Sequence, residues 1–291
     1  MTDPSDNQIN KDLIKSSMDG DSDGVVRLLA LGADHLHRNS LALCWAAKRG
    51  HGECVKLLLA ASSPKDQCSR ALCLAAAYGQ AECVSLLIPA SDPKANFSEP
   101  LCLAAKGNHI ECVTLLIPVC DPRDGGSKAL LDAVEEGNAE SVNILIPASD
   151  VKAGNSRALF RAAQLGRAEC VKLLIPVSRP EAEKSRALVC AIENGHLQCV
   201  SLLIPVSHPL LFHKAALTAV LKKGRAEVLS LMLASEPRLL MRRNLSVLQA
   251  NALSRGHSSL GALIGSLAEQ AALAKSSPDQ AHCPPRPSPR L

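Results

Sequence analysis

Apolar residues along this chain follow a helical pattern that itself repeats. The stretch 69–97, SRALCLAAAYGQAECVSLLIPASDPKANF, has apolar side chains spaced i, i+3 and i+4 in each of its two halves. This spacing places the side chains on one face of an α-helix, so each half predicts one amphipathic helix. The two apolar stripes consist of Leu72, Ala75 and Ala76, followed by Val84, Leu87 and Ile88.

Glycine, proline and serine mark where these helices begin and end. Ser69 is predicted to be the N-cap of the first helix, because a serine hydroxyl accepts a hydrogen bond from a free amide of the first turn. Gly79 suits the left-handed residue that follows a helix. Pro89 lacks an amide proton and ends the second helix. Asp92-Pro93 predicts a short capped turn in the connector.

The second helix returns with a period of 29 residues. AECVSLLIPASDP at 81–93 becomes AECVKLLIPVSRP at 168–180, and related segments lie between and beyond them. We expect eight copies, with corresponding positions at Val25, Cys54, Cys83, Cys112, Ser141, Cys170, Cys199 and Val228. Because one helix pair cannot bury its own apolar face, similar neighbours must stack on both sides of it. The sequence therefore predicts an all-α solenoid.

Both ends of the chain depart from the repeat. In the first copy, Ile14, Ser17 and Met18 are predicted to replace the Leu-Ala-Ala stripe, as suits a terminal copy that has one face in water. The tail is rich in proline and is predicted to be disordered. The expected organisation is a disordered N-terminus at 1–7, eight repeats at 8–239, a C-terminal capping helix pair at 240–272 and the disordered Pro-rich tail at 273–291.

These motifs resemble the ankyrin-repeat family. Its first-helix signature, T-P-L-H-x-A-A, is matched in part by EPLCLAA at 99–105 and more loosely by LALCWAA and RALCLAA. Gly-His pairs follow at 50–51 and 195–196, and VVRLLALGAD at 25–34 is similar to the family's second helix and terminal G-A-D. The likeness spans residues 8–268. It implies a right-handed α-solenoid whose first helices line a concave, partner-binding surface.

Two departures from the family pattern change the expected surface. The usual period is 33 residues, so a period of 29 leaves the connector four residues shorter at the place where the family has β-hairpin fingers. We therefore expect short or absent fingers. The signature histidine is replaced by cysteine in Cys44, Cys73 and Cys102, and by other residues later, so its usual hydrogen bonds are expected to be absent.

Composition argues against nucleic-acid and membrane partners. The net charge is only +4 and aromatic residues make up 2% of the chain, so neither a basic surface nor a set of stacking platforms is available. No apolar run approaches the roughly 20 residues of a membrane-spanning helix, and the start lacks the pattern of a secretory signal. We expect a cytoplasmic protein. The family resemblance adds delivery into a host cell as the alternative for a bacterial source.

Residues that could support catalysis or bind metal occur without the required arrangement. The chain has no Gly-rich phosphate loop, no H-E-x-x-H and no G-x-S-x-G. His35-x-His37 lies in a connector without a recurring carboxylate, so no metal site is predicted. Equivalent cysteines of neighbouring copies should lie about 8–10 Å apart, too far for disulfides. We predict reduced thiols, no cofactor and no enzymatic activity.

The positions that differ between copies indicate where a partner binds. In the first helix of each copy, three positions at i, i+3 and i+4 lie away from the buried stripe, and their residues change from copy to copy. The only Trp and the only Tyr of the chain both occur there. The predicted binding residues are Trp45, Lys48, Arg49, Leu74, Tyr78, Leu103, Lys106, Asp132, Glu135, Glu136, Arg161, Leu165, Glu193, Lys222 and Lys223.

These observations predict a monomeric, non-enzymatic module that binds another protein through its first helices. The acidic residues at 132–136, flanked by basic residues at 48–49 and 222–223, predict a partner with a basic middle. An alternative is a stabilising or regulatory subunit, an adaptor whose Pro-rich tail recruits a second partner through Pro284-x-x-Pro287. An enzyme is the third and most distant alternative.

Overall fold

The computed structural model describes residues 4–61, 68–180, 182–207, 209–235 and 245–276, and within this part of the chain every regular element is a helix. The odd-numbered helices begin the copies. They are α1 (Pro4–Asp19), α3 (His37–Arg49), α5 (Cys68–Ala77), α7 (Ala95–Lys106), α9 (Asp124–Glu136), α11 (Ala153–Leu165), α13 (Ala182–Asn194), α15 (Pro209–Lys223) and α17 (Leu245–Ser254).

The even-numbered helices complete the copies. They are α2 (Ser22–Ala30), α4 (Gly52–Ala61), α6 (Ala81–Leu87), α8 (Ile110–Leu116), α10 (Ala139–Leu145), α12 (Ala168–Leu174), α14 (Leu197–Leu203), α16 (Ala226–Ser235) and α18 (Ser258–Ser276). Short 3-10 turns follow three of them, η1 (Ile88–Ala90), η2 (Ile175–Val177) and η3 (Ile204–Val206).

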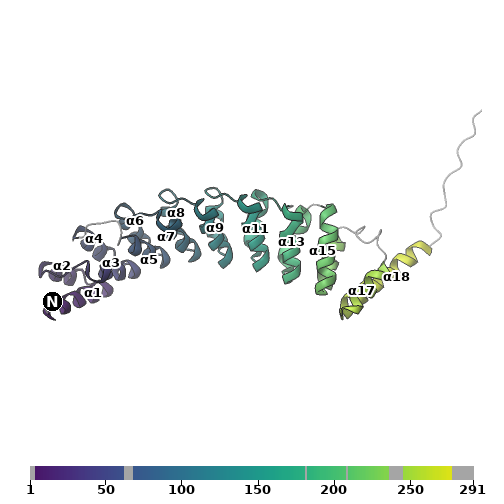
Figure 1. The fold of residues 1–291 in the computed structure, drawn as a ribbon, viewed down its shortest axis with the longest axis horizontal. Coiled ribbons are helices and arrows are strands. Elements are labelled where there is room, and N and C mark those ends of the chain that lie inside the picture. Colours follow the sequence, from purple (N-terminus) through teal and green to yellow (C-terminus); the bar gives the residue numbers. More distant parts are fainter. Residues whose placement is uncertain (1–3, 62–67, 181, 208, 236–244, 277–291) are drawn as a thin grey trace, which may run out of the picture.

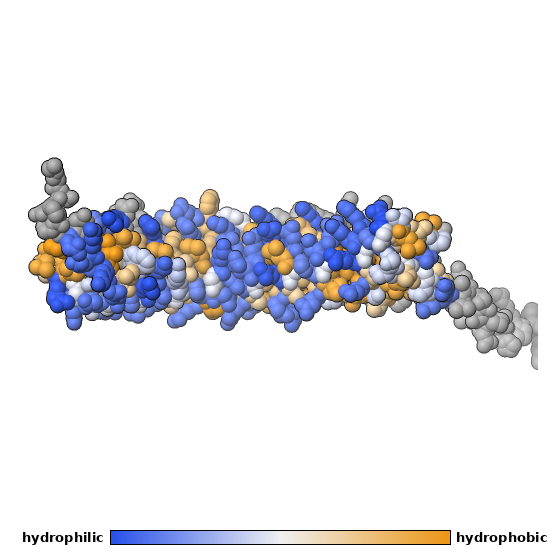
Figure 2. All heavy atoms as spheres, turned by 90° about the horizontal axis from the view of Figure 1, so that it is seen from below, coloured by the Kyte–Doolittle hydropathy of each residue, from blue (hydrophilic) through white to orange (hydrophobic). Residues whose placement is uncertain are grey.

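The helices form two layers that run the length of the molecule. Each odd helix packs on the next odd helix and on its own even partner, and the even helices pack on one another. The copies follow one another in chain order from one end of an arc to the other (Figure 1). This arrangement confirms the predicted helical solenoid. Seen from below, the surface is mostly hydrophilic, with apolar patches at several places along the array, including both of its ends (Figure 2).

The core consists of the apolar stripes that the sequence predicts. Leu87 and its equivalents in the even helices are fully buried, as are Leu72 and its equivalents in the odd helices, with small alanine and cysteine side chains between the layers. The even-helix leucines are Leu58, Leu87, Leu116, Leu145, Leu174 and Leu203, and the odd-helix leucines are Leu43, Leu72, Leu101, Leu130, Leu159 and Leu188. A single continuous core therefore holds the array together.

The register of the first copy differs from the prediction by one residue. Leu13 and Ser17 are buried there, whereas Ile14 and Met18 are only partly buried. Val25 is equivalent to Val55 rather than to Cys54, because each valine is the second of two buried residues and is followed by an exposed one, Val26 or Lys56. The step from the first copy to the second is thus 30 residues, and the extra residue is accommodated before α3.

The recurring serine hydrogen-bonds to the connector at the end of its own copy and does not cap a helix. Ser98 and Ser127 have left-handed backbones, with φ of 56° and 63°. Their hydroxyls accept hydrogen bonds from backbone amides of the following connector, at Asp121 and Asp150, over 3.0 and 2.9 Å. The predicted N-cap is therefore wrong. Asn and Gly before these serines favour a left-handed turn that draws the serine inward.

The connectors are short, and no strand is present among the described residues. Between η1 and α7 the chain needs only residues 91–94. The Asp92 carboxylate accepts a hydrogen bond from the Lys94 amide over 3.1 Å, which stabilises this turn. The expected loss of the β-hairpin fingers is confirmed.

The ends of the array differ slightly from the predicted boundaries. α1 begins at Pro4 and so extends into the segment 1–7 predicted to be disordered; proline is well suited to the first position of a helix. At the other end, α17 and α18 pair with each other and contact α15 and α16, as a capping pair would. α18 continues to Ser276, and the Pro-rich segment with Pro284 and Pro287 lies outside the described residues.

Candidate functional site: the odd-helix face

The predicted binding residues all reach one surface. We call this surface, formed by α3, α5, α7, α9, α11, α13 and α15 on the side away from the even helices, the odd-helix face. Its exposed members are Arg49, Tyr78, Lys106, Glu136, Leu165, Lys222 and Lys223, and its partly buried members are Trp45, Lys48, Leu74, Leu103, Asp132, Glu135, Arg161 and Glu193. Tyr78 is 51% exposed and Leu165 is 38% exposed. None of these side chains belongs to the buried core.

At the N-terminal end of this face, a lysine lies against two aromatic rings. Lys48 Nζ is 4.9 Å from the centre of the Trp45 ring on the same helix and 4.6 Å from the Tyr78 ring of the next copy. The Arg49 guanidinium lies 6.0 Å from the Trp45 ring. These distances are within the range of cation–π attraction. The sequence predicted these residues as neighbours on a face but not their contact.

The acidic centre of the face is paired with bases from both adjacent copies. Glu135 forms a 2.8 Å ion pair with Arg161 of α11, and Glu136 lies 3.7 Å from Lys106 of α7. Two of the three acidic residues at 132–136 thus already have basic neighbours, and the predicted preference for a partner with a basic middle stays a prediction. Successive odd helices lie one helix spacing apart, so long side chains of opposite charge at nearby positions meet. Burial raises the pKa of the third carboxyl, Asp132, with Lys128 opposing that shift.

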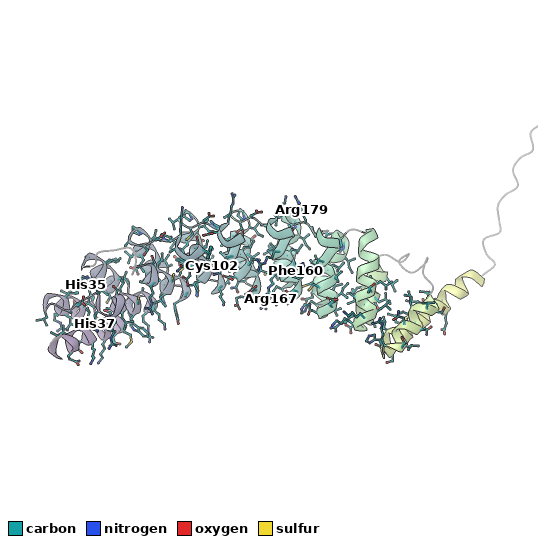
Figure 3. The ribbon with its side chains drawn as sticks, in the orientation of Figure 1. His35, His37, Cys102, Phe160, Arg167 and Arg179 are labelled. Atoms are coloured by element: carbon teal, nitrogen blue, oxygen red, sulfur yellow. The ribbon has the colours of Figure 1, made fainter. Side chains whose placement is uncertain are left out.

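A second cation–π contact lies nearer the C-terminal end. Arg186 of α13 is 4.4 Å from the ring of Phe160 on α11, and Figure 3 shows Phe160 among the odd helices of the array. Phe160 occupies the position of the replaced signature histidine. From the sequence, that position stands out only as a departure from the family pattern. The contact between Phe160 and Arg186 was therefore not predicted.

In seven copies a polar residue links the copy to the one before it, and the sequence analysis missed this function. The residue stands just before an even helix. It binds a backbone carbonyl near the C-terminal end of the odd helix in the preceding copy, and such terminal carbonyls have no partner within their own helix. The pairs are His51 with Met18 (3.1 Å), Gln80 with Lys48 (3.4 Å), His109 with Ala77 (3.0 Å), Asn138 with Lys106 (2.7 Å), Arg167 with Glu135 (2.8 Å), His196 with Gln164 (3.1 Å) and His257 with Lys222 (3.2 Å).

These links and the serine links lie on opposite edges of the array. Arg167 lies at the lower edge in Figure 3, where the odd helices end, whereas Arg179, whose amide donates to the Ser156 hydroxyl over 2.8 Å, lies at the connector edge. The odd-helix face is thus held at both edges by hydrogen bonds. Hydrogen bonds within copies and between copies therefore hold the backbone that carries its side chains.

Two natural departures from the repeat pattern together preserve the contact between two copies. Asn108 stands where other copies have the left-handed glycine, and Ser141 stands where they have a buried cysteine. The Ser141 hydroxyl donates to Asn108 Oδ1 over 2.8 Å. Asn108 is left-handed itself, with φ of 56°. The two departures from the repeat therefore compensate each other.

The cysteine side chains are unpaired and largely buried. All ten whose side chains are described are free thiols. Burial raises the pKa of Cys73, Cys102 and Cys120 to about 12, and that of Cys83 and Cys112 to about 11. A thiol with such a pKa stays protonated near neutral pH and is a poor nucleophile.

We expect these thiols to resist alkylation in the native protein below about pH 9, the ordinary range of a free thiol. The folded state holds their protons more tightly than the unfolded chain does. The stability they contribute is complete below the unfolded pKa and is lost as pH rises toward about 12. Mass spectrometry after iodoacetamide treatment, with a urea-unfolded control, measures the labelling. Rapid native labelling of Cys120 would contradict the prediction.

The described residues contain no group of three or more His, Cys, Asp or Glu side chains placed to hold a metal ion. His35 and His37 lie at the N-terminal end of the array (Figure 3). A pocket near the C-terminal end is lined by Gly195, Arg225, Glu227 and five other residues, with no histidine or cysteine among them. Across the described helices, none is both long and apolar enough to cross a membrane.

Comparisons with known proteins identify the repeat. The family model described as ankyrin repeats (3 copies) matches residues 13–97, 72–155 and 149–215. A search of curated proteins found no significant match. Among solved structures, the human ASB11 ankyrin repeat domain matches with a TM-score of 0.50 and 20% sequence identity, covering 62% of this chain and 96% of that one. At 20% sequence identity, this structural match supports a shared fold and nothing more. Because the family model covers more than half of the chain, this protein belongs to the ankyrin-repeat family.

Proposed function

We propose that this protein binds another protein through the odd-helix face and has no catalytic activity. The observation that carries the proposal is the contrast between the two sides of each odd helix. The buried side repeats almost unchanged, whereas the exposed side differs in every copy and holds the only tryptophan and the only tyrosine. Aromatic side chains with one face in water are typical anchors of protein interfaces.

The family adds general support. Ankyrin repeats are protein–protein interaction modules, and this chain carries the repeat over most of its length. The short connectors leave the odd helices, instead of fingers, as the surface that varies between copies. We place the monomeric protein in the cytoplasm, where reduced thiols are stable. A Pro-rich tail that recruits a second partner remains a separate proposal, which deletion of residues 277–291 would test.

Affinity capture with two matched variants tests the proposal. Tyr78→Ser with Leu165→Ser removes exposed apolar side chains from the odd-helix face. Asn143→Ser with Lys172→Ser changes exposed side chains of the even helices α10 and α12. Proteins retained by the wild-type chain should be lost with the first variant and kept with the second, because anchor truncation costs about 1–4 kcal/mol of binding free energy.

Unchanged capture by the first variant, or equal loss with both, would contradict binding through the odd-helix face. Melting curves of both variants serve as the folding control. Surface substitutions of this kind usually change stability by less than about 0.5 kcal/mol. A loss of binding with an unchanged melting curve therefore reports on the surface itself.

A further inference from the structure

The N-terminal end of the odd-helix face holds a lysine in a fixed position. Lys48 Nζ lies within 5 Å of both the Trp45 and the Tyr78 ring centres. The two rings come from successive copies, so the lysine bridges α3 and the end of α5. Cation–π contact on two sides reduces the freedom of a side chain that usually moves freely in solvent. Binding to this ammonium group therefore costs less conformational entropy than binding to an ordinary surface lysine.

This cation and its neighbour have no carboxylate partner among the described residues. The ion pairs along the face involve Lys106 and Arg161, whereas Lys48 and Arg49 lie more than 4 Å from any described carboxylate. Asp19, at the end of α1, is the acid at the position equivalent to Arg49, and it forms no ion pair with it. The N–H donors of Lys48 Nζ and of the Arg49 guanidinium thus remain available to a ligand.

We propose that Trp45, Lys48, Arg49, Leu74 and Tyr78, the N-terminal patch, bind an acidic segment of a partner protein in which carboxylates alternate with apolar side chains. The proposal rests on the proposed function and specifies its chemistry. A partner carboxylate receives hydrogen bonds from two unpaired cations, and a neighbouring apolar side chain covers the exposed parts of the rings and Leu74. Charge complementarity thus favours an acidic occupant.

A basic occupant is the main alternative. It would have to displace Lys48 from the two rings and approach Arg49, which is already unpaired. Like charges placed together at an interface weaken binding and suppress the wrong partner. The acidic residues farther along the face give no compensation, because Glu135 and Glu136 are already paired with Arg161 and Lys106.

Trp45 is the only tryptophan of the chain, so its fluorescence reports on the N-terminal patch alone. The probe is a synthetic peptide of repeated Glu-Leu-Glu-Gly units, and its counterpart has Lys in place of Glu. The acidic peptide should change the Trp45 emission to saturation, and the response should weaken with added salt. The basic peptide should give no saturable change. No saturable response to the acidic peptide, or equal responses to both, overturns the proposal.

Two full-length variants give the control. Lys48→Gln with Arg49→Gln should weaken the binding of the acidic peptide by about tenfold or more. Arg123→Gln with Lys172→Gln removes the same charge from exposed positions outside the odd-helix face and should leave the affinity unchanged. Equal weakening by both variants would indicate a general charge effect and would overturn the assigned site.

A random peptide library displayed on phage separates this proposal from the proposed function. Peptides selected on the intact protein should combine Asp or Glu with apolar residues and should lose binding with Lys48→Gln and Arg49→Gln. Selected peptides that are basic, or that depend only on residues such as Leu165, would overturn the acidic-segment proposal while binding through the odd-helix face stands. A library that yields no face-dependent peptide would count against both.

Discussion

Leu87→Ala should lower the free energy of unfolding by about 2–5 kcal/mol, as for other fully buried leucines. Leu87 lies in α6 and is 0% exposed, and its equivalents Leu58 and Leu116 are buried in the same way on both sides. The neighbouring copies cannot close the resulting cavity, because their own leucines are fixed by the same packing. Urea unfolding measures the loss. Ser85→Ala, at an exposed position of the same helix, is the matched control and should change little.

The damage should stay close to the altered copy. In a repeat array each copy contacts only its neighbours, so stability is a sum of local contributions. Hydrogen exchange should show faster exchange in α4, α6 and α8, whereas α12 and α14 should keep their protection. A uniform loss of protection from α1 to α16 would show that the array unfolds as one cooperative unit and would contradict this prediction.

The fold could be predicted because its determinants recur at a fixed interval. The leucines of the core, the glycines that end the odd helices and Pro89 with its equivalents all act within one copy or between identical copies. The confirmed helix pairs follow from these local signals. The first copy was placed one residue out of register, since its weak stripe around Ile14 offers two helical alignments and only packing against α3 selects Leu13.

The candidate face could be predicted as a surface but not as a set of contacts. Trp45 and Lys48 are three residues apart on one helix, so their proximity is readable in the sequence. The contact of Lys48 with Tyr78, and the pairing of Glu135 with Arg161, depend on the lateral distance between copies. The sequence gives the positions of these groups along each helix, whereas their pairing across helices depends on the angle at which successive copies stack.

The linking residues between copies were missed for a chemical reason. They alternate among His, Gln, Asn and Arg, which share hydrogen-bond donors but no common side-chain shape. A search for repeated residue types does not group them. The left-handed residue before each of them, a glycine everywhere except at Asn108, is the signal that could have found them, because most of these glycines also leave room for the linking side chain of the next copy.

Gly166→Ala should lower the free energy of unfolding by about 2–3 kcal/mol, which is large for the addition of one methyl group. Gly166 has φ of +73°, where an alanine costs about 1–2 kcal/mol. Its new Cβ would also lie 2.5 Å from His196 Nδ1 and would displace that ring. The His196 side chain would then lose its 3.1 Å hydrogen bond to the Gln164 carbonyl, at a further cost of about 1 kcal/mol.

Gly126→Ala provides the control for backbone strain alone. Gly126 has a similar φ of +68°, but nothing lies within 4 Å of the position of an added Cβ, so only the strain of about 1–2 kcal/mol should appear. In a His196→Ala background the link is already lost, and Gly166→Ala should then cost no more than Gly126→Ala does. Equal losses for Gly166→Ala in the wild-type and His196→Ala backgrounds would show that the glycine is needed for its backbone conformation only, and that the link between copies does not depend on the room it leaves.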